Sequence, residues 1–220
     1  MNVKKILPER IPSFGAIFYA AAPAKILLPY HKILVDTISL PKNSRVLDLG
    51  TGPGTLPILI AERFSDAHVI GIDLSEKMIE IATKNKKNSN ADERIEFRIM
   101  NAAKLEFDNN SFDFIISTGS MHHWREPVAI INEIYRCLKP NCEARIYDGY
   151  AEATDDDIGI GTQKMFWGFP PRALIRKIFS IHGFSQTDYD TTIKDAVAQT
   201  LFKTCRFEKN GIMMCLKFYK

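Results

Sequence analysis

The sequence predicts a doubly wound α/β fold, with a seven-stranded, mostly parallel sheet, one antiparallel strand and an N-terminal helical cap. Two observations support this prediction. Short apolar runs alternate with helical segments between residues 45 and 149, which is the pattern of a parallel sheet covered by helices on both faces. A final apolar run over residues 211–219 closes the chain, and we expect it to form the antiparallel strand.

A glycine turn follows the first apolar run and is the most informative part of the chain. Residues 46–55 read V-L-D-L-G-T-G-P-G-T, a strand that passes through a tight turn into a helix over residues 55–64. Glycine lacks a Cβ, so the chain can turn sharply there and approach a ligand closely. Backbone N–H groups at such a turn, with the N-terminus of the next helix, suit a nucleoside-type cofactor. An ordinary structural turn is the alternative interpretation.

The second apolar run, residues 67–72, ends in Asp73. A carboxylate placed about 20 residues after the glycines can accept hydrogen bonds from both hydroxyls of a ribose. Ser75 is the predicted N-cap of the next helix, with Glu76 in its first turn. Because Ser75 already fills the capping role, a purely structural role for Asp73 is disfavoured.

The pattern D-L-G-x-G-x-G over residues 48–54 resembles the first motif of class I S-adenosylmethionine-dependent methyltransferases, which have a Rossmann-like fold. A dinucleotide-binding fingerprint would instead need a third glycine where Thr55 stands. The resemblance extends over about residues 40–149 and implies S-adenosyl-L-methionine as cofactor, with S-adenosyl-L-homocysteine as product. The cofactor-binding residues that it implies are Tyr19, Asp48, Gly50, Thr51, Gly52, Gly54, Asp73, Leu74, Met78, Asn101, Ala102 and Thr118.

Two later segments continue the resemblance. After a predicted strand over residues 94–99, Asn101 stands where the family commonly has an acid that meets the adenine amino group. The Asn101 carbonyl can accept the same hydrogen bond, although without charge assistance. A helix around residues 133–140 ends in L-K-P, followed by Asn141-Cys142 where Gly-Gly is common in the family.

A histidine pair follows the predicted buried strand 112–118. Residues 120–124 read S-M-H-H-W, similar to an element found in many small-molecule methyltransferases of this class. Ligands of doubly wound sheets bind at the carboxyl ends of the strands, so we expect His122 or His123 to be the catalytic residue of the acceptor pocket. We expect no metal site, because adjacent side chains point to different faces and no acids flank the pair at metal-ligand spacing.

The remaining segments complete a single predicted domain. Residues 13–39 form one or two amphipathic helices, and in this family such a segment caps cofactor and substrate. Residues 150–170 are interpreted as an inserted loop or lid, followed by a helix over 171–182, a sixth strand over 184–190 and an extra helix over 191–204. The expected organisation is a helical cap (1–40), a cofactor-binding core (41–149), and a lid with the C-terminal half of the sheet (150–220).

Composition limits the partners and the compartment. The chain has 29 basic and 26 acidic residues among 220, a net charge of +3 that is too mild to indicate nucleic acid. No apolar run is long enough to span a membrane, and prolines and charges between residues 8 and 12 argue against a signal peptide. The four cysteines match no zinc pattern. We expect free thiols in the reducing cytoplasm.

The sequence therefore predicts a cytoplasmic methyltransferase that acts on a small molecule. The sulfonium supplies an activated methyl group, so the protein must hold the nucleophile in line at roughly 3–3.5 Å. A phenol or hydroxyl acceptor could use a histidine as general base, whereas an anionic or carbon nucleophile would need none. The alternatives are a non-catalytic S-adenosylmethionine-binding regulatory module and, less favoured, an NAD-dependent oxidoreductase.

Overall fold

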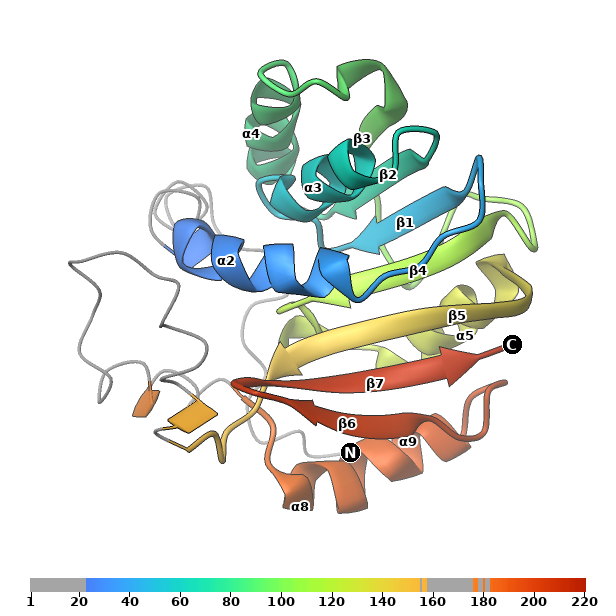
Figure 1. The fold of residues 1–220 in the computed structure, drawn as a ribbon. Coiled ribbons are helices and arrows are strands. Elements are labelled where there is room, and N and C mark those ends of the chain that lie inside the picture. The colour runs from blue at the N-terminus through green and yellow to red at the C-terminus, as the bar shows by residue number, and fades with distance from the viewer. Residues whose placement is uncertain (1–22, 155, 158–175, 178–179, 181–182) are drawn as a thin grey trace.

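The computed structural model describes residues 23–154, 156–157, 176–177, 180 and 183–220. These residues form a seven-stranded sheet in the order β3-β2-β1-β4-β5-β7-β6 (Figure 1). The strands are β1 (Arg45–Leu49), β2 (His68–Asp73), β3 (Ile95–Ile99), β4 (Phe112–Thr118), β5 (Leu138–Gly149), β6 (Arg206–Asn210) and β7 (Met213–Tyr219). The first five strands are parallel, and β7 is antiparallel to its neighbours β5 and β6. The predicted fold class is confirmed, including a final strand inserted beside the sixth.

Helices cover both faces of the sheet. The longer ones are α2 (Pro23–Asp36), α3 (Thr55–Arg63), α4 (Glu76–Lys86) and α5 (Pro127–Cys137), and the shorter ones are η1 (Asp92–Arg94), η2 (Met121–His123), α8 (Gln186–Asp188), the π-helical turn η3 (Tyr189–Ile193) and α9 (Lys194–Ala198). Figure 1 shows α2, α3 and α4 on one face and α5 and α9 on the other.

The alternation of side chains along β1 divides the core into two halves. Val46 packs with residues of α2 and α3, whereas Leu47 and Leu49 pack with residues of α5 and α9. A strand that buries side chains on both faces needs an almost continuous apolar run, which is what β1 and β4 have. The two halves of the core hold the carboxyl ends of these strands in place.

The strand order reverses between β1 and β4. The chain moves outward from β1 to β2 and β3, then returns to the other side of β1 with β4 and continues to β5. At such a reversal the loops after the two central strands diverge toward opposite faces, which leaves a crevice where ligands of this fold bind. The candidate site should therefore lie where residues 50–54 and residues 119–124 leave the sheet.

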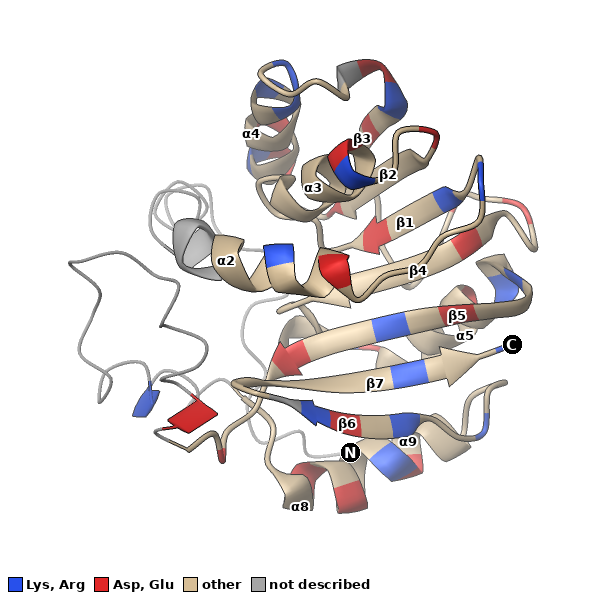
Figure 2. Cartoon of the chain, viewed as in Figure 1, with Lys and Arg blue, Asp and Glu red and all other residues tan. Residues whose placement is uncertain are grey.

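The C-terminal third differs from the prediction. Residues 184–190 are not a strand, because only Phe184 pairs, in an isolated bridge with Tyr150, and Ser185 then begins α8 with a capping box to Asp188. The sixth strand is β6, which lies at the edge of the sheet and carries charges of both signs (Figure 2). Charged side chains on an edge strand prevent edge-to-edge association. Because β6 is mostly charged and polar, it has no apolar run by which the sequence could predict it.

Three further expectations need a correction or cannot be compared. The extra helix expected over 191–204 ends at Ala198, and Lys203 adopts a left-handed conformation (φ 65°). The L-K-P segment begins β5, because α5 already ends at Cys137. Tyr19, most of the expected lid and most of the helix over 171–182 lie outside the described residues.

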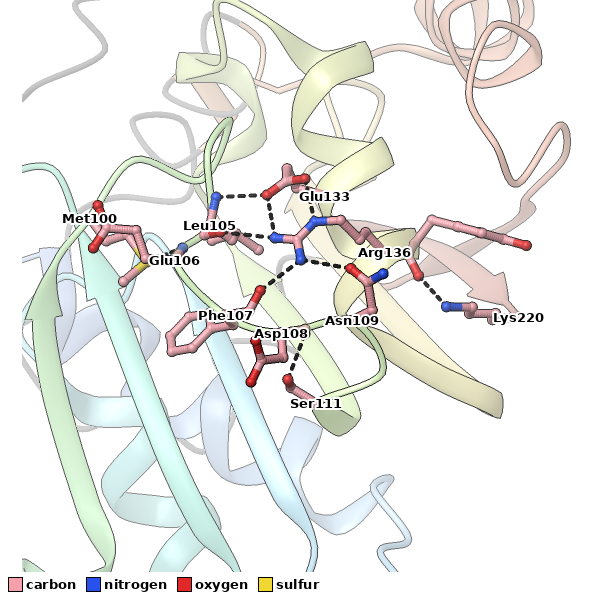
Figure 3. Close-up of polar contacts among 11 residues, drawn as sticks. Met100, Leu105, Glu106, Phe107, Asp108, Asn109, Ser111, Glu133, Arg136 and Lys220 are labelled. Atoms are coloured by element: carbon pink, nitrogen blue, oxygen red, sulfur yellow. Dashed lines mark hydrogen bonds and ion pairs between the residues drawn. The ribbon is translucent and has the colours of Figure 1, made fainter.

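A polar cluster on α5 fixes the connection that enters β4 (Figure 3). The Arg136 guanidinium donates to both carboxylate oxygens of Glu133, each at 2.8 Å, and to the carbonyl oxygens of Leu105 and Phe107 at 2.9 and 2.6 Å. Glu133 also accepts the Leu105 N–H at 2.8 Å. A planar fork of donors can satisfy several acceptors at once, so this ion pair holds residues 105–107 against α5.

The structure also shows the state of the cysteines and the character of the helices. All four cysteines are free, as predicted: Cys137, Cys142, Cys205 and Cys215. Within the described part of the chain, no helix has both the length and the apolar character needed to cross a bilayer.

Candidate functional site

The loop after β1 is built on three glycines in the left-handed region. Gly50, Gly52 and Gly54 have φ values of 71°, 52° and 79°, which side chains with a Cβ rarely adopt. A Cβ on Gly50 would lie 2.6 Å from the Cβ of Ser120, and one on Gly54 would lie 2.6 Å from the Phe97 ring. No described atom lies within 4 Å of the corresponding position on Gly52. The loop is thus tight on two sides and uncrowded at its middle glycine.

Asp73 joins this loop to the end of β2. Its Oδ2 accepts the Gly52 N–H at 2.9 Å, and its Oδ1 accepts the Ser75 N–H at 2.8 Å. Burial raises the pKa of Asp73, and the backbone N–H groups of Ser75, Gly52 and Leu74 oppose part of that rise. The two carboxylate oxygens have four lone pairs in all, so an acceptor position remains for a further donor such as a ribose hydroxyl.

Asp48 lies at the carboxyl end of β1 and is 1% exposed. Among the described residues, its Oδ1 has no hydrogen-bond partner. Burial raises the pKa of Asp48 to about 7, the Thr51 side chain opposes part of that rise, and the nearby charge of Asp73 adds to it. Buried polar atoms are almost always paired, so the Oδ1 of Asp48 beside the glycine loop is a candidate acceptor for a bound donor.

The other predicted cofactor residues differ in accessibility. Leu74 and Ala102 are half-buried, and Asn101 is exposed. The Asn101 Oδ1 accepts the Ala103 N–H at 2.9 Å, so it shapes its own turn and keeps one lone pair for a ligand. Met78 is 1% exposed and lies in the first turn of α4, on the buried face of the helix.

The loop after β4 packs directly against the glycine loop. The Ser117 hydroxyl donates to the Leu49 carbonyl oxygen at 2.9 Å and lies 2.6 Å from the Ser120 hydroxyl, to which the Trp124 indole donates at 3.2 Å. Gly119, between the two serines, has a φ of 62° and no described atom within 4 Å of the position of a Cβ. The Ser117 side chain therefore joins the carboxyl ends of β1 and β4.

His122 is hydrogen-bonded to Asp148, a residue that the sequence did not single out. Its Nδ1 lies 2.8 and 3.0 Å from the two oxygens of Asp148, and its backbone N–H donates to Asp148 at 3.0 Å. The side chain of Asp148 is 2% exposed, whereas that of His122 is 18% exposed. Burial lowers the His122 pKa, but the charge and hydrogen bond of Asp148 outweigh it, so the pKa is raised.

The two histidines are thereby distinguished. Their rings lie with centroids 4.1 Å apart, but it is His122 whose Nδ1 meets a buried carboxylate. A carboxylate only accepts, so the ring nitrogen that faces Asp148 carries a proton. The available signal for Asp148 was its position: it follows Tyr147, which pairs with Thr118 of β4, so both acid and histidine lie just past neighbouring strand ends.

A further histidine closes the site from the helical side. His31 on α2 is 8% exposed, and its Nε2 lies 3.4 Å from the Thr118 hydroxyl. Burial lowers the His31 pKa to about 4, so its imidazole is neutral at physiological pH. The contact places α2 over the end of β4.

One pocket opens beyond the end of β5. It has a volume of about 450 Å³, and among the described residues it is lined by Ala151, Glu152, Ala153, Thr154, Arg176, Lys177 and Ser180. Both cationic side chains belong to exposed residues. Its position just after Asp148 makes it a candidate part of the acceptor side. No group of three or more His, Cys, Asp or Glu residues within the described ranges is arranged to hold a metal ion.

Comparison with known proteins gives a family match. The profile of a methyltransferase domain matches residues 40–164, more than half of the chain. Phosphoethanolamine N-methyltransferase 3 of Arabidopsis thaliana is 34% identical over 117 residues, which are 53% of this chain and 23% of that protein. Demethylmenaquinone methyltransferase of Listeria welshimeri is 26% identical over 148 residues, 67% of this chain and 62% of that protein.

A solved structure extends the likeness to nearly the whole chain. A Methanococcus maripaludis protein, assigned as an S-adenosyl-L-methionine-dependent methyltransferase, has a TM-score of 0.74 over 96% of this chain and 94% of that chain. The identity is 22%, so this likeness concerns the fold. The chain spans only about a quarter of the length of the first phosphoethanolamine N-methyltransferases that it matches.

Proposed function

This chain belongs to the methyltransferase-domain family, and we propose that it transfers a methyl group from S-adenosyl-L-methionine to a small-molecule acceptor. The observation that carries the proposal is the unit made by Asp73 and Gly52. A carboxylate at the end of β2 is hydrogen-bonded to the glycine loop at the end of β1, beside the crevice where ligands of this fold bind. A ribose placed there would meet the remaining lone pairs of the carboxylate.

The residues around the loop fit the rest of this cofactor. Gly52 leaves its backbone accessible for close approach. Asp48 supplies a buried, unpaired carboxyl oxygen, and a positively charged ligand group would favour its ionised form. When bound, the cofactor supplies a methyl group on a sulfonium, which needs no covalent help from the protein. The residues of the chain orient the two reactants and exclude water from them.

The acceptor side is assigned to the loop 119–124 and the pocket beyond β5. The loop follows the carboxyl end of β4, at the switch point, and the pocket follows the carboxyl end of β5, the neighbour of β4. The named relatives act on a phosphorylated amine and on a quinone precursor, which differ widely in chemistry. The family match therefore supports a small-molecule acceptor without naming one, and His122 and His123 are the proposed catalytic residues.

Two other functions make different predictions. A nicotinamide-dependent oxidoreductase is disfavoured by Thr55, which occupies the place of the third glycine of a dinucleotide loop. A regulatory module would bind S-adenosyl-L-methionine and turn nothing over. These alternatives are separated by binding and turnover measured on the same preparation.

The test begins with titration calorimetry of the full chain with S-adenosyl-L-methionine, S-adenosyl-L-homocysteine and NAD. We expect binding of both sulfur nucleosides and none of NAD. Methyl transfer is then measured with methyl-labelled cofactor against a panel of phosphoethanolamine, a short-chain demethylmenaquinol, catechol and a thiol. Binding of NAD alone would refute the cofactor assignment. Tight cofactor binding with no turnover on any acceptor would leave the regulatory module as the function.

A further inference from the structure

One ring nitrogen of the buried His31 on α2 has no partner. The side chain lies over the end of β4, where its Nε2 is 3.4 Å from the Thr118 hydroxyl. His31 is 8% exposed, and its Nδ1 is enclosed and has no hydrogen-bond partner among the described residues. Buried polar atoms are almost always paired, so the ligand-free chain leaves this nitrogen without the hydrogen bond that it needs.

The contact with Thr118 places the ring next to the acceptor side. Thr118 is the last residue of β4, and the loop 119–124 follows it directly. Gly119 has a φ of 62°, and no described atom lies within 4 Å of the position of a Cβ on it. The first residue of the loop is therefore not packed against the described chain on that side. His31 lies where α2 meets this uncrowded start of the loop.

The His31 imidazole can meet a ligand without any charge on either partner. Burial lowers its pKa to about 4, so one ring nitrogen carries a proton at physiological pH and the other has a lone pair. The Thr118 hydroxyl can donate or accept, so its contact with Nε2 is compatible with both tautomers. Nδ1 can thus donate to a carbonyl oxygen or accept from a hydroxyl group.

We propose that His31 is a specificity-determining residue for the acceptor, and that its Nδ1 forms a hydrogen bond with an uncharged hydroxyl or carbonyl group of that molecule. The inference rests on the proposed function and adds to it a residue of α2. Because Nδ1 is enclosed in the ligand-free chain, α2 must shift slightly when the acceptor binds. Pro29 precedes Tyr30 and His31 inside the helix, and it has no N–H to donate to the preceding turn, so the helix can bend there.

The alternative is that His31 only packs under α2, and Tyr30 provides the comparison. Tyr30 is 5% exposed, and its hydroxyl also has no partner among the described residues. It belongs to the same half of the core as Tyr147 and Cys215, where packing explains the ring. His31 instead contacts the polar end of β4. An apolar side chain could fill that place without burying an unpaired nitrogen, so packing alone does not explain an imidazole there.

Two amide variants separate the two ring nitrogens. Asparagine places its amide near the position of Nδ1, and glutamine places its amide near that of Nε2. KM and kcat are measured with catechol and the short-chain demethylmenaquinol, whose polar groups are uncharged hydroxyls. His31→Gln should raise KM by about tenfold or more, because the acceptor group loses its buried partner, and should leave kcat within about threefold. His31→Asn should keep KM within about threefold of the wild-type value.

Tyr30→Phe is the matched control, because it removes the other unpaired polar atom of α2 and keeps the ring. Its KM should equal that of the wild type. Calorimetric affinity for S-adenosyl-L-methionine should stay within about twofold in all three variants, and circular dichroism establishes that each is folded. NMR of the ¹⁵N-labelled wild type needs no variant. The His31 Nδ1 resonance should shift when the better of the two acceptors joins the complex with S-adenosyl-L-homocysteine.

Four results would overturn the inference. The first is a KM that is unchanged in His31→Gln, or raised equally in His31→Asn, since Nδ1 would then not matter. The second is a Nδ1 resonance that ignores an acceptor which the enzyme methylates. The third is turnover confined to acceptors without an uncharged hydroxyl or carbonyl group, such as phosphoethanolamine. The fourth is a loss of cofactor affinity in His31→Gln, which would assign His31 to the cofactor. Cofactor binding without any turnover would instead refute the proposed function, and the inference with it.

Discussion

The Asp73 Oδ2 accepts the Gly52 N–H at 2.9 Å, so the acid that ends β2 and the glycine loop that ends β1 form one unit without any ligand. The same carboxylate accepts the Ser75 N–H at 2.8 Å, beside the N-cap of α4. An acid at a strand end is commonly solvated, but burial raises the pKa of this one. Its removal should therefore affect both cofactor binding and the loop itself.

Asp73→Ala should weaken S-adenosyl-L-methionine binding by at least tenfold in calorimetry. Hydrogen bonds to a charged group are each worth about 1.5–3 kcal/mol, and about 1.4 kcal/mol is one decade of affinity. Because two backbone donors also lose their acceptor, we expect the free energy of unfolding to fall by about 1–3 kcal/mol in urea titrations.

Asp73→Asn separates the two effects. One carbonyl oxygen remains for the Gly52 or Ser75 N–H, so the loss in stability and in affinity should be smaller than for alanine. Asp36→Ala is the control, because Asp36 is exposed and outside every motif. A folded Asp73→Ala protein that binds the cofactor within twofold of wild type would show that the cofactor site lies elsewhere.

Gly52→Ala should fold and lose cofactor binding. Its φ of 52° strains any L-residue by about 1–2 kcal/mol, but no described atom would contact the new methyl group. A bound cofactor would contact it, so affinity should fall at least tenfold, beyond what strain alone explains.

Gly211→Ala is the matched control for that variant. Gly211 has a φ of 61° and also has no described atom within 4 Å of the position of a Cβ, but it lies in the turn between β6 and β7. It should lose similar stability in denaturant titrations and keep its affinity for the cofactor. Equal affinity losses in the two variants would contradict a close approach of the cofactor to Gly52.

The elements around the glycine loop could be predicted because several local signals agree there. β4 was placed at residues 112–118, as found, and the N-cap of α4 at Ser75 is confirmed by its hydrogen bond to the Met78 N–H. Apolar runs bounded by glycine and capping residues leave few alternative boundaries. The glycine spacing also predicted the tight turn between β1 and α3, where Gly50, Gly52 and Gly54 have positive φ values.

The features that the sequence did not predict are the contact between His122 and Asp148 and the position of the sixth strand. The pairing of His122 with Asp148 joins residues 26 apart, and it needs the register of β4 on β5, which no local pattern gives. A strand was expected over residues 184–190 because it would continue the alternation of strands and helices, but the Ser185–Asp188 capping box is a helix-start signal and prevailed. The true sixth strand is a charged edge strand with little apolar character.

Arg136→Lys should lower stability without changing cofactor affinity. Lysine keeps the charge but has no planar fork, so it cannot serve Glu133 and two carbonyl oxygens together. We expect a loss of about 1–2 kcal/mol in the free energy of unfolding. Arg206→Lys is the control, because the Arg206 side chain is 70% exposed and its ion pair with Glu208 should contribute little. Equal losses in both variants would contradict the special role of the guanidinium.

Asp48 makes the stability of the ligand-free protein depend on pH. Its folded-state pKa is about 7, above the value of about 3.9 for an unfolded chain. The folded protein thus holds a proton that the unfolded chain releases more easily. The resulting stabilisation is complete below about pH 4 and is lost as pH rises through about 7. At pH 8 the buried group must carry a charge for which no described residue provides a partner at Oδ1.

Asp48→Asn removes that titration and keeps the shape of the side chain. At pH 8 the variant should be more stable than wild type, by up to about 4 kcal/mol for a difference of about three pKa units. The difference should shrink as pH falls toward 4. Urea titrations of the two proteins at pH 5 and 8, without ligand, measure it, and Asp36→Asn should show no such trend because Asp36 is exposed. A stability difference that is the same at both pH values would mean that Asp48 does not titrate in this range.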